Sequence, residues 1–214
     1  MDEKKYNVEI SGKVISEPWF SFEENGEKYY DFFVEVKRSF YGFSGLSVNV
    51  HVRTTESLIV KESLTFGKRI AVCGVIESYV TRARGKEYGY LIVRAEGIGA
   101  CVPYKGGGVI SDKNEVKVTG VVSETPILKD THNSVMLYLT LDVEGENGIE
   151  KIPCTAYGKV VYSLQDVEKG DVVSVEGRIF QRSVCAGAGN SGNEYISTYE
   201  LEIVRVAELS EEEN

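Results

Sequence analysis

Three aromatic residues and two cations fall within one short glycine-containing segment, KRSFYGFSG, at positions 37–45. Aromatic rings offer flat faces on which bases can stack, and basic side chains can neutralise phosphates, so the segment has both contacts that a single nucleic-acid strand needs. Packing against the second half of the chain or a partner subunit is the alternative, because exposed aromatic clusters also mark protein interfaces. The candidate residues are Lys37, Arg38, Phe40, Tyr41 and Phe43.

The stretches on either side of this segment alternate with the period of two that is typical of β-strands. In residues 28–38, Phe32, Val34 and Val36 share one apolar face, and in residues 46–53 three valines do the same. The residues between them point to the opposite face of the sheet. On that face we expect Tyr29, Phe33, Lys37, His51 and Arg53.

A second basic and aromatic cluster lies in YVTRARGKEYGY, at positions 79–90, where Gly85-Lys86 indicates a turn between two strands. A hairpin that is merely solvated would also explain these charges. The candidate nucleic-acid-binding residues here are Tyr79, Arg82, Arg84 and Lys86.

The sequence offers no arrangement typical of catalysis. His51 and His132 lie in different halves of the chain, and no serine, aspartate or cysteine constellation accompanies either. The four cysteines lack the two-residue spacing of a zinc site or a redox motif, so reduced thiols are the simplest interpretation. We therefore expect no catalytic residue, no metal site and no cofactor, and we do not expect an enzyme.

The chain has 214 residues and a net charge of -9, which is unevenly distributed. Residues 1–100 carry 14 basic and 14 acidic side chains, whereas residues 101–214 carry 10 and 19. Because nucleic-acid affinity depends mainly on basic side chains that neutralise phosphates, the balanced first half remains able to bind a polyanion. The longest apolar stretches are about one strand long and the N-terminus has no apolar signal region, so we expect a cytoplasmic protein without a membrane partner.

The sequence repeats itself. NVEISGKVISEP at 7–18 aligns with EVKVTGVVSETP at 115–126, and FGKRIAVCGVI at 66–76 aligns with KGDVVSVEGRI at 169–179. The repeats occur in the same order, so each copy is a whole domain. We predict a first domain at 1–100, a glycine-rich linker at 101–112, a second domain at 113–209 and an acidic end at 210–214.

Each copy shows five strand patterns, with a short helix between the third and fourth. The expected strands are 6–18, 28–38, 46–53, 68–80 and 87–98, then 113–126, 134–144, 149–156, 171–182 and 194–207. Thr54 or Thr55 can begin the first helix and Gly67 ends it, while the second helix falls near 159–166. This predicts an all-β protein of two tandem OB-fold Greek-key barrels, with a generic SH3-like barrel as the alternative.

The second copy resembles bacterial single-stranded DNA-binding proteins. The resemblance lies in Tyr157-Gly158-Lys159, Lys169-Gly170-Asp171 and Val175-Glu176-Gly177-Arg178, and covers about 95 residues of that copy. It implies base-stacking and phosphate-contacting roles for Tyr157 and Lys159. Where the family stacks bases at two further positions, this chain has Lys151 and Val184, so we expect the first copy to carry most of the binding.

The resemblance implies largely sequence-independent binding of single-stranded DNA during replication, repair or recombination. RNA is the alternative ligand, which the sequence does not distinguish from DNA. The resemblance also implies a homodimer of two-domain chains, giving four OB folds. The alternative function is a non-catalytic OB-fold module for protein interaction or assembly, similar to a primosome accessory protein, because a shared fold does not fix function.

Overall fold

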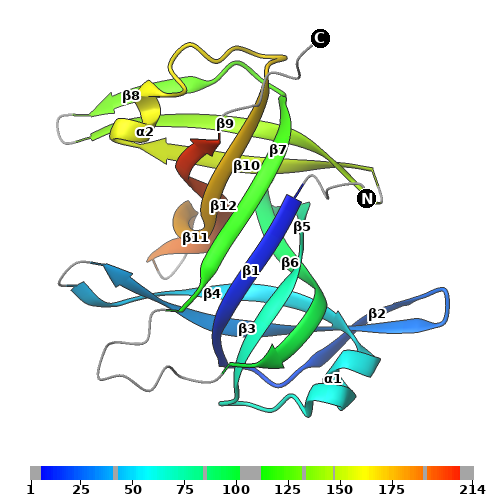
Figure 1. Cartoon of the computed structure of the whole chain (residues 1–214). Helices are drawn as coiled ribbons and strands as arrows, with labels where there is room; N and C mark the ends of the chain where they lie inside the picture. Colours follow the sequence, from blue (N-terminus) through cyan, green and yellow to red (C-terminus); the bar gives the residue numbers. More distant parts are fainter. Residues whose placement is uncertain are drawn as a thin grey trace, which may run out of the picture. The chain divides into compact units, whose positions relative to one another are not determined.

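The computed structural model describes residues 6–40, 43–83, 86–101, 112–131, 134–146, 148–189 and 192–207, which form strands joined by turns and two short helices (Figure 1). The first copy contains β1 (Tyr6–Val14), β2 (Trp19–Glu24), β3 (Glu27–Phe40), β4 (Phe43–Thr55), α1 (Glu56–Glu62), β5 (Arg69–Ala83) and β6 (Lys86–Ala100). The second contains β7 (Asn114–Val122), β8 (Ile127–Thr131), β9 (Ser134–Gly145), β10 (Gly148–Tyr157), α2 (Lys159–Tyr162), β11 (Val172–Gly189) and β12 (Gly192–Ala207). Within the described ranges, no helix has the length and apolar character needed to cross a membrane.

The chain divides into two compact units. The N-terminal unit consists of Asn7–Glu77 and Ile92–Glu115, and the C-terminal unit consists of Met1–Tyr6, Ser78–Leu91 and Val116–Asn214. The far end of the β5–β6 hairpin, which belongs to the first copy by sequence, is therefore grouped with the second copy. The domain boundary at 101–112 stays a prediction.

Each copy closes its strands in the same order. In the first, β1 pairs with β3 and β5, β3 pairs with β4, and β4 runs parallel to β6, which neighbours β5. In the second, β7 pairs with β9 and β11, β9 with β10, β10 in parallel with β12, and β12 with β11. This is the closed five-strand arrangement expected for an OB barrel, with β2 and β8 as additional short strands.

The apolar faces predicted from the alternation form the two cores. Phe32, Val34 and Val36 are buried, as are the three valines of β4 that they face. Burial of such side chains is the main favourable term for each barrel. The second core is built from Val116, Val118, Leu139, Leu141, Ile152, Val175, Ile179, Leu201 and Ile203.

The repeated glycines mark places where two strands cross closely. A Cβ on Gly12 would collide with the carbonyl oxygen of Glu35, and one on Gly120 would lie 2.8 Å from that of Asp142. Gly74 and Gly177 are equally constrained, against the carbonyls of Arg94 and Glu202. Only glycine allows such an approach, so these residues repeat because barrel closure needs them.

The turns that precede β5 and β11 are also alike. The N–H groups of Gly67 and Gly170 donate to the carbonyls of Val14 and Val122 at 2.8 and 2.9 Å. Both glycines have positive φ, +85° and +99°, which is the left-handed region that favours glycine. The same turn is thus built twice.

The first predicted strand of each copy, 6–18 and 113–126, is shorter in the structure, and it is followed by a strand that was not predicted, β2 or β8. β1 ends at Val14, and the hydroxyl of Ser16 accepts the N–H of Phe33 at 2.8 Å in place of a backbone carbonyl. Pro18 has no N–H to donate, so the ladder cannot continue through it. Pairing resumes at Trp19, in β2. The predicted helix start is confirmed, since Thr55 is the N-cap residue of α1.

Candidate nucleic-acid interface

The outer surface of β3 and β4 carries the predicted site residues of the N-terminal unit. Phe33 pairs with His51, and Asp31 pairs with Arg53, on the side of the sheet opposite the buried valines. OB folds bind oligonucleotides on the face of these two strands, which are the second and third of the barrel. We call this surface, with its neighbours on β2, the Trp19 face.

Three rings meet at the centre of the Trp19 face. The ring of Trp19 lies 5.5 Å from Phe33 and 5.8 Å from His51, and Phe33 lies 5.0 Å from His51, measured between centroids. Trp19 is 40% exposed, whereas His51 is only 6% exposed beneath the other two. Ring pairs at these distances support one another, so Trp19 is held as a platform with an accessible surface.

A second aromatic pair lies beside this platform. Phe22 stacks on Tyr29 with centroids 4.7 Å apart and an interplanar angle of 15°, and the guanidinium of Arg53 lies 4.9 Å from the Phe22 ring. The Phe22–Tyr29 pair and Arg53 extend the aromatic surface along β2 and β3.

A buried carboxylate anchors the charged part of the Trp19 face. Asp31 is 4% exposed and accepts hydrogen bonds from Arg53 Nε at 2.9 Å and from the hydroxyl of Ser21 at 3.1 Å. His51 Nε2 lies 3.1 Å from its Oδ2. Burial alone would raise the pKa of Asp31, but His51 and Arg53 hold that pKa well below its usual value. Arg53 thus pairs with the buried Asp31 while its guanidinium lies over the Phe22 ring.

The remaining predictions for the first copy belong to the segments 37–45 and 79–90. Lys37 is exposed at the end of the described part of the face. Tyr79 lies in the C-terminal unit. Tyr41 and Arg84 are outside the described residues, as are the side chains of Arg38, Phe40, Phe43, Arg82 and Lys86.

The corresponding surface of the second copy, which we call the Tyr138 face, is organised around one arginine. An NH2 group of Arg182 donates to Glu200 Oε1 at 2.6 Å and to the hydroxyl of Tyr157 at 3.0 Å. The guanidinium carbon of Arg182 and Lys129 Nζ lie 5.4 and 4.9 Å from the centroid of Tyr138. Predicted residue Tyr157 therefore belongs to a cluster, while Lys159 is exposed at the start of α2.

The titratable groups of the Tyr138 face are strongly influenced by burial. Burial raises the pKa of Glu200, and the nearby charge of Arg182 acts in the opposite direction. Burial likewise raises the pKa of the Tyr157 hydroxyl. The ion pair with Arg182 therefore opposes the effect of burial on the Glu200 carboxylate.

The hairpin end grouped with the C-terminal unit is fixed by polar and aromatic contacts. The N–H and hydroxyl of Ser78 both donate to Glu150 Oε2, at 2.6 and 2.8 Å. Tyr90 lies 4.9 Å from Tyr79 and 4.6 Å from Tyr199, which is buried. Tyr79, one of the predicted site residues, thus packs on the hairpin while keeping part of its ring exposed.

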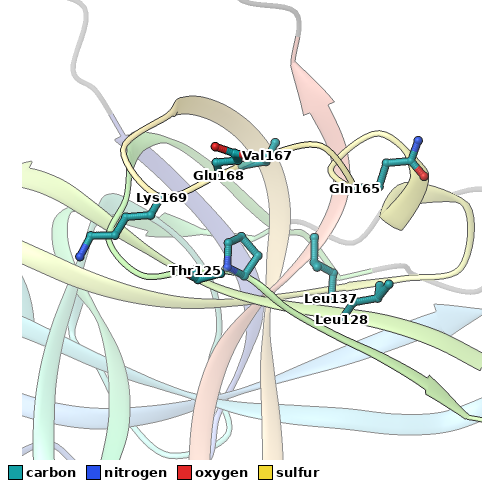
Figure 2. Close-up of a pocket in the computed structure, with 8 residues that line it drawn as sticks. Thr125, Leu128, Leu137, Gln165, Val167, Glu168 and Lys169 are labelled. Carbon is teal, nitrogen blue, oxygen red and sulfur yellow. The ribbon is translucent and has the colours of Figure 1, made fainter.

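The C-terminal unit also contains a pocket of about 370 Å³ that is lined by both apolar and polar residues (Figure 2). Figure 2 shows Val167, Glu168 and Lys169 on one loop and Leu128 and Leu137 on neighbouring strands. Leu137 precedes Tyr138 in β9, so their side chains point to opposite faces of the strand. The pocket is therefore separate from the Tyr138 face. Within the described ranges, no cluster of His, Cys, Asp or Glu is arranged to hold a metal ion.

Trp19, Phe22, Lys129 and Arg182 were not among the predicted site residues; Trp19 can be interpreted from the sequence as a base-stacking ring, but an anchor at the barrel rim is the favoured interpretation. The signal for the first two was present, because the Asn25-Gly26 turn requires a strand on each side and therefore predicts one at WFSFEE. Arg182 carried no such signal, since its partners lie on other strands far away in the sequence.

No protein-family model matches the sequence, and no curated protein sequence matches it either. Solved structures do. The single-stranded DNA-binding protein from Thermus aquaticus matches over 98% of this chain and 95% of that chain, with a TM-score of 0.73 and 20% sequence identity. A deletion variant of the same protein matches over 100% of both chains with the same score and identity.

The chain has the fold of this single-stranded DNA-binding protein. The all-β prediction of two tandem OB barrels is thereby confirmed. The dimeric N-terminal domain of PriB from Thermoanaerobacter tencongensis matches over 46% of this chain and 99% of that chain at 27% identity, with a TM-score of 0.38. At these identities and scores the likeness concerns architecture, so function has to be argued from the two faces.

Proposed function

We propose that the protein binds single-stranded DNA with little sequence preference, mainly through the Trp19 face. The observation that carries this proposal is the exposed ring of Trp19 supported by Phe33 and His51, on the strands with which OB folds bind oligonucleotides. Base stacking on aromatic rings tolerates any sequence, because every base has a flat face.

The phosphates would be neutralised by cations around the rim of this face. Lys37 is exposed there, and the sequence predicts Arg38 as a further cation in the same segment. The cations predicted in segment 79–90 belong to a hairpin end that is grouped with the C-terminal unit, and we propose them as separate phosphate contacts. Arg53 is engaged by Asp31, so we assign it to positioning and not to phosphate contact. The chain would coat exposed strands in replication, repair or recombination as a cytoplasmic homodimer with four OB barrels, and RNA would compete as a ligand. No catalytic step is proposed.

Binding of a labelled oligo-dT, followed by fluorescence anisotropy, tests this function. Replacing Trp19 or Phe33 with alanine should weaken binding roughly 5- to 150-fold, since each stacked base contributes about 1–3 kcal/mol. Phe66→Ala is the matched control, because Phe66 is exposed in the same unit but contacts Lys13 away from these rings. Equal affinity of all three variants would reject the site, and absence of binding by the wild type would favour the protein-interaction function.

A further inference from the structure

The Tyr138 face has the parts of a binding site, yet its main cation is already occupied. Tyr138 and Tyr157 are half-buried, so part of each ring is accessible, and Lys129 and Arg182 lie close to the Tyr138 ring. Both cations lie over the Tyr138 ring, so a phosphate bound at this cluster would meet both of them. Arg182 is paired with Glu200, because an NH2 group of the arginine donates a hydrogen bond to Glu200 Oε1 at 2.6 Å.

We propose that Glu200 keeps the Tyr138 face a weak nucleic-acid site by neutralising Arg182, so that removal of the Glu200 charge converts this face into a second single-strand site. The inference rests on the proposed function, and it deepens that function by naming the residue that separates a strong face from a weak one.

The burial of Glu200 makes its charge effective. Glu200 is 8% exposed, so water screens its charge poorly, and a phosphate approaching Arg182 would also approach the carboxylate. Burial raises the pKa of Glu200, and the charge of Arg182 at 2.6 Å acts in the opposite direction. The amide of glutamine has the same shape without the charge, and would leave Arg182 able to bind a phosphate.

The other charges of this face do not duplicate this arrangement. Lys151 pairs with Asp142 at 3.0 Å on β9 and β10, and Arg178 donates to Glu202 at 3.0 Å on β11 and β12. Glu202 lies two residues after Glu200 on the same strand and therefore on the same side of the sheet. It offers a matched control, since its arginine partner is a different one.

The experiment measures oligo-dT affinity in the full chain carrying Trp19→Ala and Phe33→Ala, which weaken the other face. Adding Glu200→Gln should tighten binding about tenfold and steepen the log-log salt dependence by about 0.7, the value for one more phosphate contact on a single strand. Adding Glu202→Gln should change neither quantity. Adding Arg182→Gln to the Glu200→Gln variant should remove the gain.

An unchanged affinity in a folded Glu200→Gln protein, checked by circular dichroism, would overturn the inference, as would a gain that survives the loss of Arg182. Where Glu200→Gln does not fold, the parent variant is titrated from about pH 8 to about pH 5. Protonation of Glu200 should then tighten binding, and Arg182→Gln should abolish that part of the pH dependence; equal pH dependence with and without Arg182 would reject it. Binding of oligo-dT by the wild type, which tests the proposed function, is unaffected by either result.

Discussion

The two copies share a scaffold and differ at equivalent positions of one face. The N–H of Ile15 donates to the carbonyl of Phe33, and that of Ser123 donates to Thr140, which makes Phe33 and Thr140 equivalent. Counting along the paired strands, His51 corresponds to Pro153 and Lys37 to Glu144. Rings and a cation in the first copy are thus replaced by small or acidic residues in the second.

The two copies therefore share the residues that close a barrel and differ in the residues of the face that we propose as the binding surface. The glycines at the strand crossings and the turns before β5 and β11 are the same in both copies. The faces instead use different solutions, a three-ring platform anchored by Asp31 and a tyrosine cluster restrained by Glu200. The motifs that resemble single-stranded DNA-binding proteins lie in the second copy, although the first copy has the larger cluster of aromatic rings on its face.

The largest loss of stability is expected from substitutions at the strand-crossing glycines, which both copies share. Gly12→Val and Gly120→Val should each destabilise the protein by about 3 kcal/mol or more, because the new side chain would collide with a backbone carbonyl at a strand crossing. Thermal unfolding measures this effect. Gly99→Ala is the control, since a Cβ at this position would have no atom within 4 Å. A tolerated valine at either crossing would show that the two barrels do not share this constraint.

The next largest loss of stability is expected at Asp31, the buried carboxylate that anchors the Trp19 face of the first copy. Asp31→Asn should lower the free energy of unfolding by about 2 kcal/mol at neutral pH, because Arg53 loses a buried partner. The pKa of Asp31 is depressed in the folded protein, so its contribution is present above the ordinary aspartate pKa near 3.9 and is lost as the pH falls below it.

The difference in free energy of unfolding between the wild type and the Asp31→Asn variant should accordingly become smaller at acidic pH. Urea unfolding at several pH values measures it, with exposed Asp130→Asn as the control. If this difference in free energy of unfolding did not change with pH, the charge of Asp31 would not be what anchors the face.

Introducing a second-copy residue into the Trp19 face should weaken the binding of oligo-dT. Phe33→Thr places the second-copy residue on the Trp19 face and should weaken oligo-dT binding about tenfold, the loss of roughly one stacked base. Thr140→Val is the control, as it alters the equivalent position without adding or removing a ring. An unaltered affinity for Phe33→Thr would mean that Phe33 does not support the platform.

The smallest effect is expected at the rim. Lys37→Glu, again the second-copy type of residue, should weaken binding a few-fold and reduce the log-log salt slope by about 0.7, the value for one phosphate contact. Exposed Lys61, on α1, gives the control Lys61→Glu. If both substitutions lowered the slope equally, the effect would be one of net charge and not of the face.

Much of the fold could be predicted because its causes are local. Alternation located the buried Phe32, Val34 and Val36, and the repeat located the glycines that close the barrels. Pro18 was also a local signal, but the predicted first strand was extended as far as residue 18, and the strand that follows, β2, was not predicted. The expected side of the sheet for Phe33 and Arg53 followed from the period of two.

The interactions within each face could not be predicted, because they join residues that are distant in sequence. Asp31 lies on the face that alternation describes, but its capture of Arg53 depends on which strands become neighbours. The same holds for Arg182, whose partners Tyr157 and Glu200 come from two other strands. Sequence patterns indicate which side chains are outward, whereas the ion pairs decide which of those charges remain available.

The Trp19 face is tested most directly by the intrinsic fluorescence of Trp19, the single tryptophan of the chain. Titration of the wild-type protein with oligo-dT at low salt should quench this fluorescence as bases stack on the ring, and added salt should reverse the quenching. Binding detected by anisotropy without any change in Trp19 fluorescence would contradict the assignment of this face as the principal site.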